Sequence, residues 1–219
     1  MQLVSMNAIT RPIPRKDGPI TVEEYIAYVA RISNPVNQNN TLTAKKLLRY
    51  LAKHKHWSPF EMVNVVMEIN TTRDIARQIL RHRSFSFQEF SQRYADPSSD
   101  MGFTIREARL QDTKNRQNSL AVDDVQLQIA WSAKQNQIIH EAKLAYKWAI
   151  ENNIAKEQAR CVLPEGNTNS RIYMNGTLRS WIHYCQLRMT EGTQKEHRNI
   201  AKECWNILCN EFSFLAELD

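Results

Sequence analysis

Apolar and polar residues alternate along parts of the chain, and this pattern predicts β-strands. Residues 1–10 alternate until the prolines at 12 and 14 stop the pattern. Residues 63–69 carry an aliphatic side chain at every second position, as a half-buried strand does. Residues 171–175 predict a further strand. We therefore expect a sheet that contains the 63–69 and 171–175 segments.

Apolar residues at helical spacing predict the helices. Thr21 followed by Glu24 has the spacing of a capping box, so a helix should begin there and end at Ser33-Asn34-Pro35. Further helices are expected at 42–54, 73–81, 122–152 and 177–188, with a short one near 160 and another that carries Cys204 and Cys209. The polar segment 95–119 has no firm period, so it is expected to be a long loop. The pattern predicts an α/β fold, a sheet wrapped by helices, with the long C-terminal helices available for assembly.

The segment 73–94 is RDIARQILRHRSFSFQEFSQRY, which holds five arginines and no lysine. Arginine is favoured where a planar fork binds phosphate or carboxylate through two hydrogen bonds. On a helix, Arg73, Arg77 and Arg81 would form one cationic stripe, while Ile75 and Ile79 would face a core. Beyond Arg83 come side chains that can hydrogen-bond a sugar or a polar ring: Ser84, Ser86, Gln88, Glu89, Ser91, Gln92, Arg93 and Tyr94. We interpret the segment as an anion-binding site.

Composition narrows the class of protein. The chain has 219 residues, of which 42% are apolar and 24% charged, and its formal net charge is +6. These values suit a globular protein with an anionic partner, and the basic residues form no continuous block. The glycines stand only at 18, 102, 166, 176 and 192, which excludes the glycine-rich dinucleotide turn and the phosphate loop.

The cysteines at 161, 185, 204 and 209 include no Cys-x-x-Cys pair. We therefore expect four reduced and mostly buried thiols, with neither a metal site nor a disulfide framework. No apolar run approaches the length of a membrane span, and the N-terminus lacks a basic start followed by an apolar core. A cytoplasmic protein without membrane contact is expected.

Arg81-His82-Arg83, then seven residues and Ser91, and then Arg93-Tyr94, resemble the signature of the flavin-dependent thymidylate synthases. These enzymes methylate dUMP without a catalytic cysteine. The resemblance continues in other segments, which are His56 to Glu61 (HWSPFE), Ala159 to Pro164 (ARCVLP), an Arg-led strand from 171, and the helix from Thr177-Leu178-Arg179 to Leu187-Arg188. This chain departs from the family's common pattern in two places. Met62 stands where a second histidine is frequent, and Thr177 where asparagine is common.

The resemblance implies a single domain over residues 1–219, with a central mixed or antiparallel sheet and without a Rossmann fold. It implies conversion of dUMP to dTMP, with methylenetetrahydrofolate as the one-carbon donor and with FAD, reduced by NADPH, as the hydride carrier. No covalent enzyme nucleophile takes part. A homotetramer with active sites shared between subunits is also implied.

The family's functional positions transfer to this sequence residue by residue. The implied catalytic residues are Arg188, which would stabilise charge on the uracil, and His56, beside the reaction centre. The implied cofactor-binding residues are Ser58, Arg81, His82, Arg83, Glu89, Thr177, Leu178, Arg179 and His183. The implied dUMP-binding residues are Gln78, Arg81, Glu89, Phe90, Ser91, Gln92, Arg93, Arg160 and Arg188. Ser91 is expected to bind phosphate, because its neighbours in sequence offer no general base that would make it a nucleophile.

Three other interpretations compete with this one. An amphipathic surface helix could pair its arginines with acids of a neighbouring element. A basic helical module could bind nucleic-acid phosphates, although the tryptophans at 57, 131, 148, 181 and 205 are not interleaved with the arginines. A flavin carrier without methylation would keep the FAD residues, but it would give Arg160 and Arg188 no purpose. Because nine residues span two and a half helical turns, Arg179 and Arg188 should serve different ligand groups.

Overall fold

The computed structural model describes residues 3–14 and 18–218. The strands are β1 (Val4–Ile9), β2 (Asn64–Thr72), β3 (Phe85–Glu89), β4 (Arg109–Gln111), β5 (Ser119–Ala121) and β6 (Asn169–Thr177). The α-helices are α1 (Val22–Ala30), α2 (Ala44–Lys53), α3 (Arg73–Ile79), α4 (Pro97–Asp100), α5 (Val125–Glu151), α6 (Lys156–Ala159), α7 (Leu178–Arg188) and α8 (Lys195–Glu211). Short 3-10 helices are η1 (Pro35–Asn37), η2 (Ser58–Met62), η3 (Arg160–Val162) and η4 (Leu215–Glu217). The predicted α/β class is confirmed.

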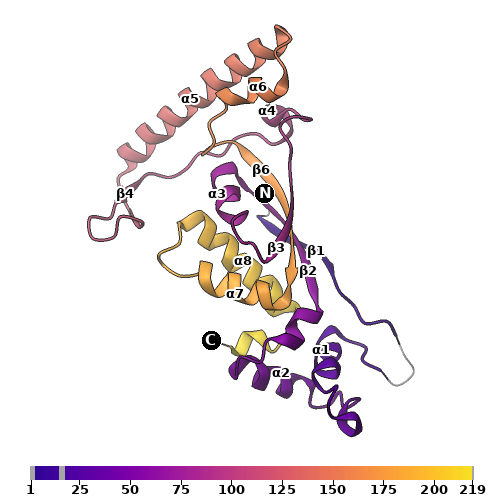
Figure 1. Ribbon diagram of the computed structural model, residues 1–219. Helices are drawn as coiled ribbons and strands as arrows, with labels where there is room; N and C mark the ends of the chain where they lie inside the picture. The colour runs from indigo at the N-terminus through magenta and orange to yellow at the C-terminus, as the bar shows by residue number, and fades with distance from the viewer. Residues whose placement is uncertain (1–2, 15–17, 219) are drawn as a thin grey trace.

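The main sheet has four antiparallel strands in the order β1-β2-β6-β3 (Figure 1). The predicted strands at 63–69 and 171–175 are the two central ones, β2 and β6. The sequence did not predict β3, which pairs Phe85 with Gly176 and Glu89 with Ile172. It also missed the hairpin of β4 and β5, which lies at the end of the segment expected to be a long loop. Residues 1 and 2 of the predicted first strand lie outside the described part of the chain.

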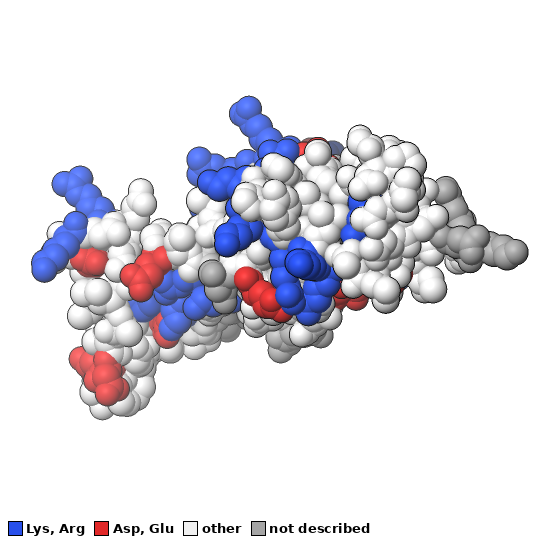
Figure 2. Space-filling view, turned by 90° about the horizontal axis from the view of Figure 1, so that it is seen from below, with Lys and Arg blue, Asp and Glu red and all other residues white. Residues whose placement is uncertain are grey.

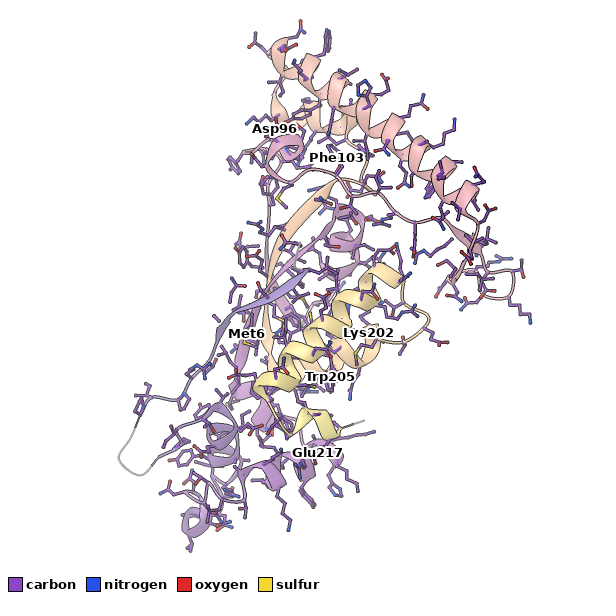
Figure 3. The ribbon with its side chains drawn as sticks, turned by 180° about the vertical axis from the view of Figure 1, so that it is seen from behind. Met6, Asp96, Phe103, Lys202, Trp205 and Glu217 are labelled. Carbon is purple, nitrogen blue, oxygen red and sulfur yellow. The ribbon has the colours of Figure 1, made fainter. Side chains whose placement is uncertain are left out.

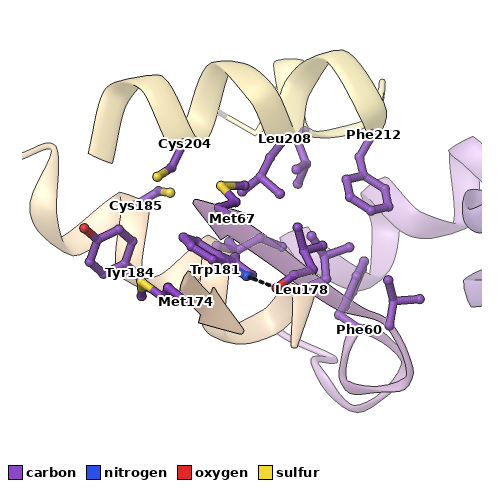
Figure 4. Packing of buried hydrophobic residues seen from close by; sticks show 14 of the residues in the cluster. Phe60, Met67, Met174, Leu178, Trp181, Tyr184, Cys185, Cys204, Leu208 and Phe212 are labelled. Carbon is purple, nitrogen blue, oxygen red and sulfur yellow. Dashed lines mark hydrogen bonds between the residues drawn. The ribbon is translucent and has the colours of Figure 1, made fainter. Parts of the chain in front are cut away.

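The helices α3, α7 and α8 cover one face of the sheet (Figure 1). Alternate side chains of β2, among them Val65, Met67 and Ile69, are fully buried against them. Trp181 of α7 is completely buried, and its indole N–H donates to the carbonyl oxygen of Val65 at 2.9 Å (Figure 4). Full burial of an aromatic or aliphatic side chain contributes about 1.5 to 3 kcal/mol. This packing holds α7 firmly on the sheet.

The opposite face of the sheet carries no helix in the described part of the chain and is polar (Figure 1). On this face the carboxylate of Glu68 accepts a hydrogen bond from the Tyr173 hydroxyl at 2.9 Å and pairs with Arg171 at 3.3 Å. The hydrogen bond from Tyr173, followed by Asn70 and the charge of Arg171, lowers the pKa of Glu68. The polar side chains of this face thus find their partners on neighbouring strands of the same sheet.

Helix α5 lies at one end of the molecule, beside α4 and α6 (Figure 1). Tyr146 and Ala149 pack with Ala159 and Leu163 in a small core, against which Phe103 rests (Figure 3). Several large apolar side chains of α5 are exposed: Trp131 (44%), Ile138 (54%), Leu144 (51%) and Trp148 (61%). The long helix α5 therefore leaves much of its apolar surface unburied, whereas α7 and α8 pack most of their apolar residues against the sheet.

All four cysteines are free thiols, and the expected burial holds for two of the four. Cys185 and Cys204 are buried and face each other between α7 and α8 (Figure 4), whereas Cys161 is exposed. Burial raises the pKa of the Cys185 and Cys204 thiols. Within residues 3–14 and 18–218, no helix has the length and apolar character needed to cross a membrane.

Candidate active site

The residues implied as functional gather at the two ends of β6 and β3. Thr177, at the end of β6, leads into α7, while Ser91 follows β3 at the level where β6 begins. Thr177 lies seven positions after Ser170 along β6, a rise of about 23 Å. The predicted flavin residues Ser58, Thr177 and Arg179 and the predicted phosphate residues Ser91 to Arg93 therefore occupy opposite ends of one strand.

The flavin end is built from η2 and the first turn of α7. The Thr177 hydroxyl caps α7 by accepting from the backbone N–H of Ser180 at 3.2 Å. Arg179 donates to the carboxylate of Glu61 at 2.5 Å. Leu178 has a fully buried side chain, and its backbone N–H donates to Val63. This hydrogen bond ties the start of α7 to the corner between η2 and β2.

Aromatic and imidazole rings border the flavin end. The ring of His183 meets that of Trp57 edge-on, with centroids 4.7 Å apart. Partial burial, together with the charge of Arg179, lowers the pKa of His183. His56 and Ser58 are exposed, and the His56 ring lies 6.3 Å from that of Tyr50. These side chains stand on the surface, where a planar ligand can reach them.

The Arg81-His82-Arg83 motif lies in the turn between α3 and β3. The guanidinium Nε of Arg188, at the end of α7, donates to Nε2 of His82 at 2.9 Å. Burial, followed by the charges of Arg188 and Arg81, lowers the pKa of His82 to about 4. His82 is therefore neutral at physiological pH and accepts a hydrogen bond through Nε2. Arg81 and Arg83 are exposed, and neither has a carboxylate partner among the described residues.

The expected cationic stripe on α3 is not free surface. The helix ends at Ile79, so Arg81 lies beyond it. Arg73 is buried, and it pairs with Glu89 at 3.6 Å and with Glu165 at 3.4 Å. Arg77 contacts the same two acids, at 3.2 Å each. The alternative interpretation therefore holds for Arg73 and Arg77, which pair with acids from β3 and from the turn before β6. The prediction that Ile75 and Ile79 face the core is confirmed.

The phosphate end contains the loop after β3 and the 3-10 helix η3. Arg93 pairs with the carboxylate of Glu157 at 3.3 Å, and Arg160 donates to the carbonyl oxygen of Glu157 at 3.3 Å. Two guanidinium groups far apart in sequence thus meet at one residue. The Ser91 hydroxyl oxygen accepts from the backbone N–H of Arg93 at 3.3 Å. Gln92 is buried, and its amide nitrogen has no hydrogen-bond partner among the described residues.

Behind Gln78 lies a buried polar pair that the sequence analysis did not identify. His197 of α8 lies 3.1 Å from the hydroxyl of Tyr184 and 3.2 Å from the side-chain oxygen of Gln78. Burial lowers the pKa of His197 to about 3, so the imidazole is neutral. Gln78 also donates to Gln194 at 2.8 Å. The only sequence signal was two polar residues on otherwise apolar helix faces, and nothing connected them to Gln78.

Comparisons with known proteins place the chain in a family. The family model described as "Thymidylate synthase complementing protein" matches residues 20–212. The probable flavin-dependent thymidylate synthase of Paramecium bursaria Chlorella virus 1 is 47% identical over 96% of this chain and 95% of its own length. The flavin-dependent thymidylate synthase of a Synechocystis species is 46% identical over 95% of both chains. The chain belongs to the flavin-dependent thymidylate synthase family.

Solved structures agree on the fold. The UMP/dUMP methylase PolB from Streptomyces cacaoi, bound with 5-Br UMP, superposes with a TM-score of 0.80 over 98% of this chain and 92% of that chain, at 21% identity. The same enzyme bound with 5-Br dUMP gives a TM-score of 0.77 at 22% identity, over 98% of this chain and 93% of that chain. The antiparallel sheet with helices on one face is thus an arrangement shared with these proteins.

Proposed function

We propose that this flavin-dependent thymidylate synthase converts dUMP to dTMP. One observation carries the proposal for this chain. Arg188 is held by a neutral His82, next to two guanidinium groups, Arg81 and Arg83, without a carboxylate partner in the described chain. Such a cluster is suited to anionic ligands and to charge that develops on a polar ring.

In this proposal the phosphate end of the site holds the dUMP phosphate. Arg93 and Arg160 supply charge, and Ser91 with the partnerless amide of Gln92 supplies hydrogen bonds. Ser91 takes no part in covalent chemistry, because its oxygen accepts from a backbone N–H and no side-chain base among the described residues hydrogen-bonds it. Gln78, Arg81, Glu89 and Phe90 would contact the sugar or the base.

The flavin end suits FAD without a glycine-rich turn. Arg81 and Arg83 would bind the cofactor's diphosphate, with Ser58, His82, Glu89, Thr177, Leu178, Arg179 and His183 around the remainder. The exposed guanidinium groups and the exposed Ser58 and His183 are free to take up these contacts. Bound FAD, reduced by NADPH, supplies the hydride, while methylenetetrahydrofolate supplies the carbon.

The protein's own contribution is orientation and charge stabilisation. Arg188 would stabilise negative charge on the uracil ring, which makes its carbon nucleophilic. The acceptor nitrogen of His82 fixes the Arg188 guanidinium in one orientation, since that nitrogen is unprotonated near neutral pH. His56, exposed at the flavin end, would lie beside the reaction centre.

We further propose a homotetramer whose active sites are shared between subunits. The separation of the flavin and phosphate ends along β6 is longer than a nucleoside monophosphate, which supports completion of each site by a second copy. The exposed apolar residues of α5 and the helix-free face of the sheet offer surfaces for such contacts. Residues 1–219 would then act as one domain, and the free thiols fit a cytoplasmic location.

The alternative of a nucleic-acid-binding module has less support. On the face shown in Figure 2, the Lys and Arg side chains stand in separate groups, with Asp and Glu between several of them. Trp181 is fully buried, which removes one candidate for base stacking. A flavin carrier without methylation would give the Arg93 and Arg160 pair no purpose.

The proposed function is tested with purified protein loaded with FAD. Incubation with dUMP, methylenetetrahydrofolate and NADPH should yield dTMP, detected by mass spectrometry, and omission of any one of them should abolish the product. A colourless protein that binds oligonucleotides and forms no dTMP would support the nucleic-acid alternative. A yellow protein that oxidises NADPH without forming dTMP would support the flavin carrier.

A further inference from the structure

A second basic pocket lies between the β4–β5 hairpin and the start of α8, in a position that the site described above does not include. Its volume is about 420 Å³, and four basic side chains line it: Arg109, Arg116, Lys195 and Arg198. Pockets of this size accommodate small ligands or parts of larger ones. Residues of the hairpin line one side, and residues 193–195 and 198, from the turn before α8 and its first turn, line the other.

The charges of this pocket are only partly balanced. Arg109 donates to the carboxylate of Glu196 at 2.6 Å, and Lys195 contacts Glu107 at 2.6 Å. Arg116 and Arg198 have no carboxylate partner in the described chain, and Arg198 makes only a 3.4 Å contact with the backbone oxygen of Glu191. The acidic group of the hairpin, Asp112, is held by Asn118 and by backbone N–H groups of its own turn.

One donor in the pocket is buried without a partner. The Nη1 atom of Arg109 is buried and makes no hydrogen bond within residues 3–14 and 18–218, although the other terminal nitrogen is paired with Glu196. A buried guanidinium nitrogen without a hydrogen-bond partner has lost its hydrogen bonds to water and gained none in return, which destabilises the folded protein. An anion bound in the pocket would satisfy it and would also neutralise the excess charge.

The pocket adjoins the proposed nucleotide site. Gln194 lines it, and the side-chain oxygen of Gln194 accepts from Gln78 at 2.8 Å. Gln78 is one of the residues proposed to contact dUMP. The hydrogen-bonded pair of Gln78 and Gln194 separates the pocket from the proposed nucleotide site. A ligand that reacts at the nucleotide could therefore also extend into the pocket.

We infer that this pocket binds the anionic end of a co-substrate, an inference that rests on the proposed function. Both proposed co-substrates have anionic groups far from their reacting rings. NADPH has the 2′-phosphate, and the folate has the carboxylates of its glutamate chain. Guanidinium groups bind phosphate and carboxylate through paired hydrogen bonds, so the same four basic residues suit either group.

The test compares the wild type with an Arg116→Ala/Arg198→Ala variant in the FAD-loaded protein. The control is Lys53→Ala/Lys202→Ala, which removes two exposed basic residues that do not line the pocket, and Figure 3 labels Lys202 on α8. Isothermal titration measures the dissociation constants of NADP⁺ and NAD⁺, and of tetrahydrofolate with one or three glutamates. For a phosphate ligand, the wild type and the control should prefer NADP⁺, and the pocket variant should lose that preference by about tenfold or more.

If the pocket instead binds the glutamate chain of the folate, the wild type and the control should prefer tetrahydrofolate with three glutamates over that with one. Only the pocket variant should lose this preference. Equal affinities in all three proteins for all four ligands would overturn the inference. Arg116→Gln provides a second variant, because substitution of an exposed hairpin residue leaves folding intact, and it should show about half the effect. Pyrophosphate-dependent protection against thermal unfolding is measured in parallel. Pyrophosphate protection without dTMP formation would contradict the proposed function while leaving the anion pocket in place.

Discussion

The Nε atom of Arg188 lies 2.9 Å from Nε2 of His82, so the last turn of α7 is joined to the turn between α3 and β3. The donor is always charged, and burial with two neighbouring arginines keeps the pKa of the acceptor at about 4. The contact therefore links a residue proposed to act on uracil with one proposed to contact FAD. It also keeps the Arg188 guanidinium in one orientation across the neutral pH range.

Arg83→Ala should lower retention of FAD far more than affinity for dUMP. The exposed guanidinium has no carboxylate partner in the described chain, so its loss removes a charge-assisted hydrogen bond to phosphate that contributes about 1.5 to 3 kcal/mol. The measurement is flavin absorbance per protein after dialysis, together with a dUMP titration, and Lys53→Ala is the control. Equal losses of FAD retention and dUMP affinity would show that Arg83 does not serve FAD in preference to dUMP.

Ser91→Ala should weaken dUMP binding and leave turnover at saturating dUMP measurable. The Ser91 oxygen accepts from the backbone N–H of Arg93, and no side-chain base within residues 3–14 and 18–218 hydrogen-bonds it. Steady-state kinetics should therefore show a raised KM and a retained kcat, with Ser86→Ala as the control. Loss of turnover in a variant that binds dUMP normally would restore Ser91 as a candidate nucleophile.

Stability should fall as the pH decreases from about 6.5 towards 4. The pKa of His82 is lowered to about 4 and that of His197 to about 3, whereas an unfolded histidine titrates near 6.5. In this window the unfolded chain binds more protons than the folded chain, so unfolding becomes more favourable at lower pH. Each histidine that is protonated only on unfolding adds a slope of up to about 1.4 kcal/mol per pH unit.

Urea unfolding at several pH values measures this slope. His197→Gln should flatten it, because the variant removes one of the two histidines, while His140→Gln removes an exposed histidine and serves as the control. A His197→Gln curve parallel to that of the wild type would contradict the assignment of His197 as a buried neutral group.

Gly176→Ala should destabilise the pairing of β6 with β3. A Cβ atom at Gly176 would lie 2.3 Å from Cδ1 and 2.5 Å from Cε1 of Phe85, its partner across the strands. Overpacking of this kind costs about 1 to 3 kcal/mol, which thermal unfolding can detect. Gly166→Ala is the matched control, since nothing lies within 4 Å of its Cβ position. Partial rescue by Phe85→Leu would show that the contact itself causes the loss.

Local sequence signals predicted the local parts of the fold. The capping box at Thr21 forms as expected, with the Glu24 N–H 3.2 Å from the Thr21 hydroxyl and the Thr21 N–H 2.9 Å from the Glu24 carboxylate. Strand β3 was missed because only Phe85 and Phe87 mark its core side, within a run of polar residues. Its pairing with β6 depends on residues far away in the chain.

The sequence predicted which residues belong to the candidate site, but it did not predict how their side chains pair in the folded chain. The motif spacing indicated which arginines to consider, but not that Glu165 would form ion pairs with Arg73 and Arg77. Likewise, the pairing of Tyr184 with His197 behind Gln78 has no signature, because α7 and α8 meet only in the folded chain. Arg179 and Arg188 have different partners in the fold, Glu61 and His82. That the two arginines serve different ligand groups stays a prediction from their nine-residue spacing.

The central claim is that this chain methylates dUMP and that Arg188 stabilises the charged uracil. An interaction that strengthens on the way to reaction affects turnover more than binding. Arg188→Lys keeps the charge but loses the planar fork, so it should rescue little. NADPH-driven flavin reduction and dTMP formation are measured in the wild type, Arg188→Lys and Arg188→Ala. Flavin reduction should persist in all three and dTMP formation should collapse in both variants, whereas near-normal dTMP formation by Arg188→Ala would contradict the account.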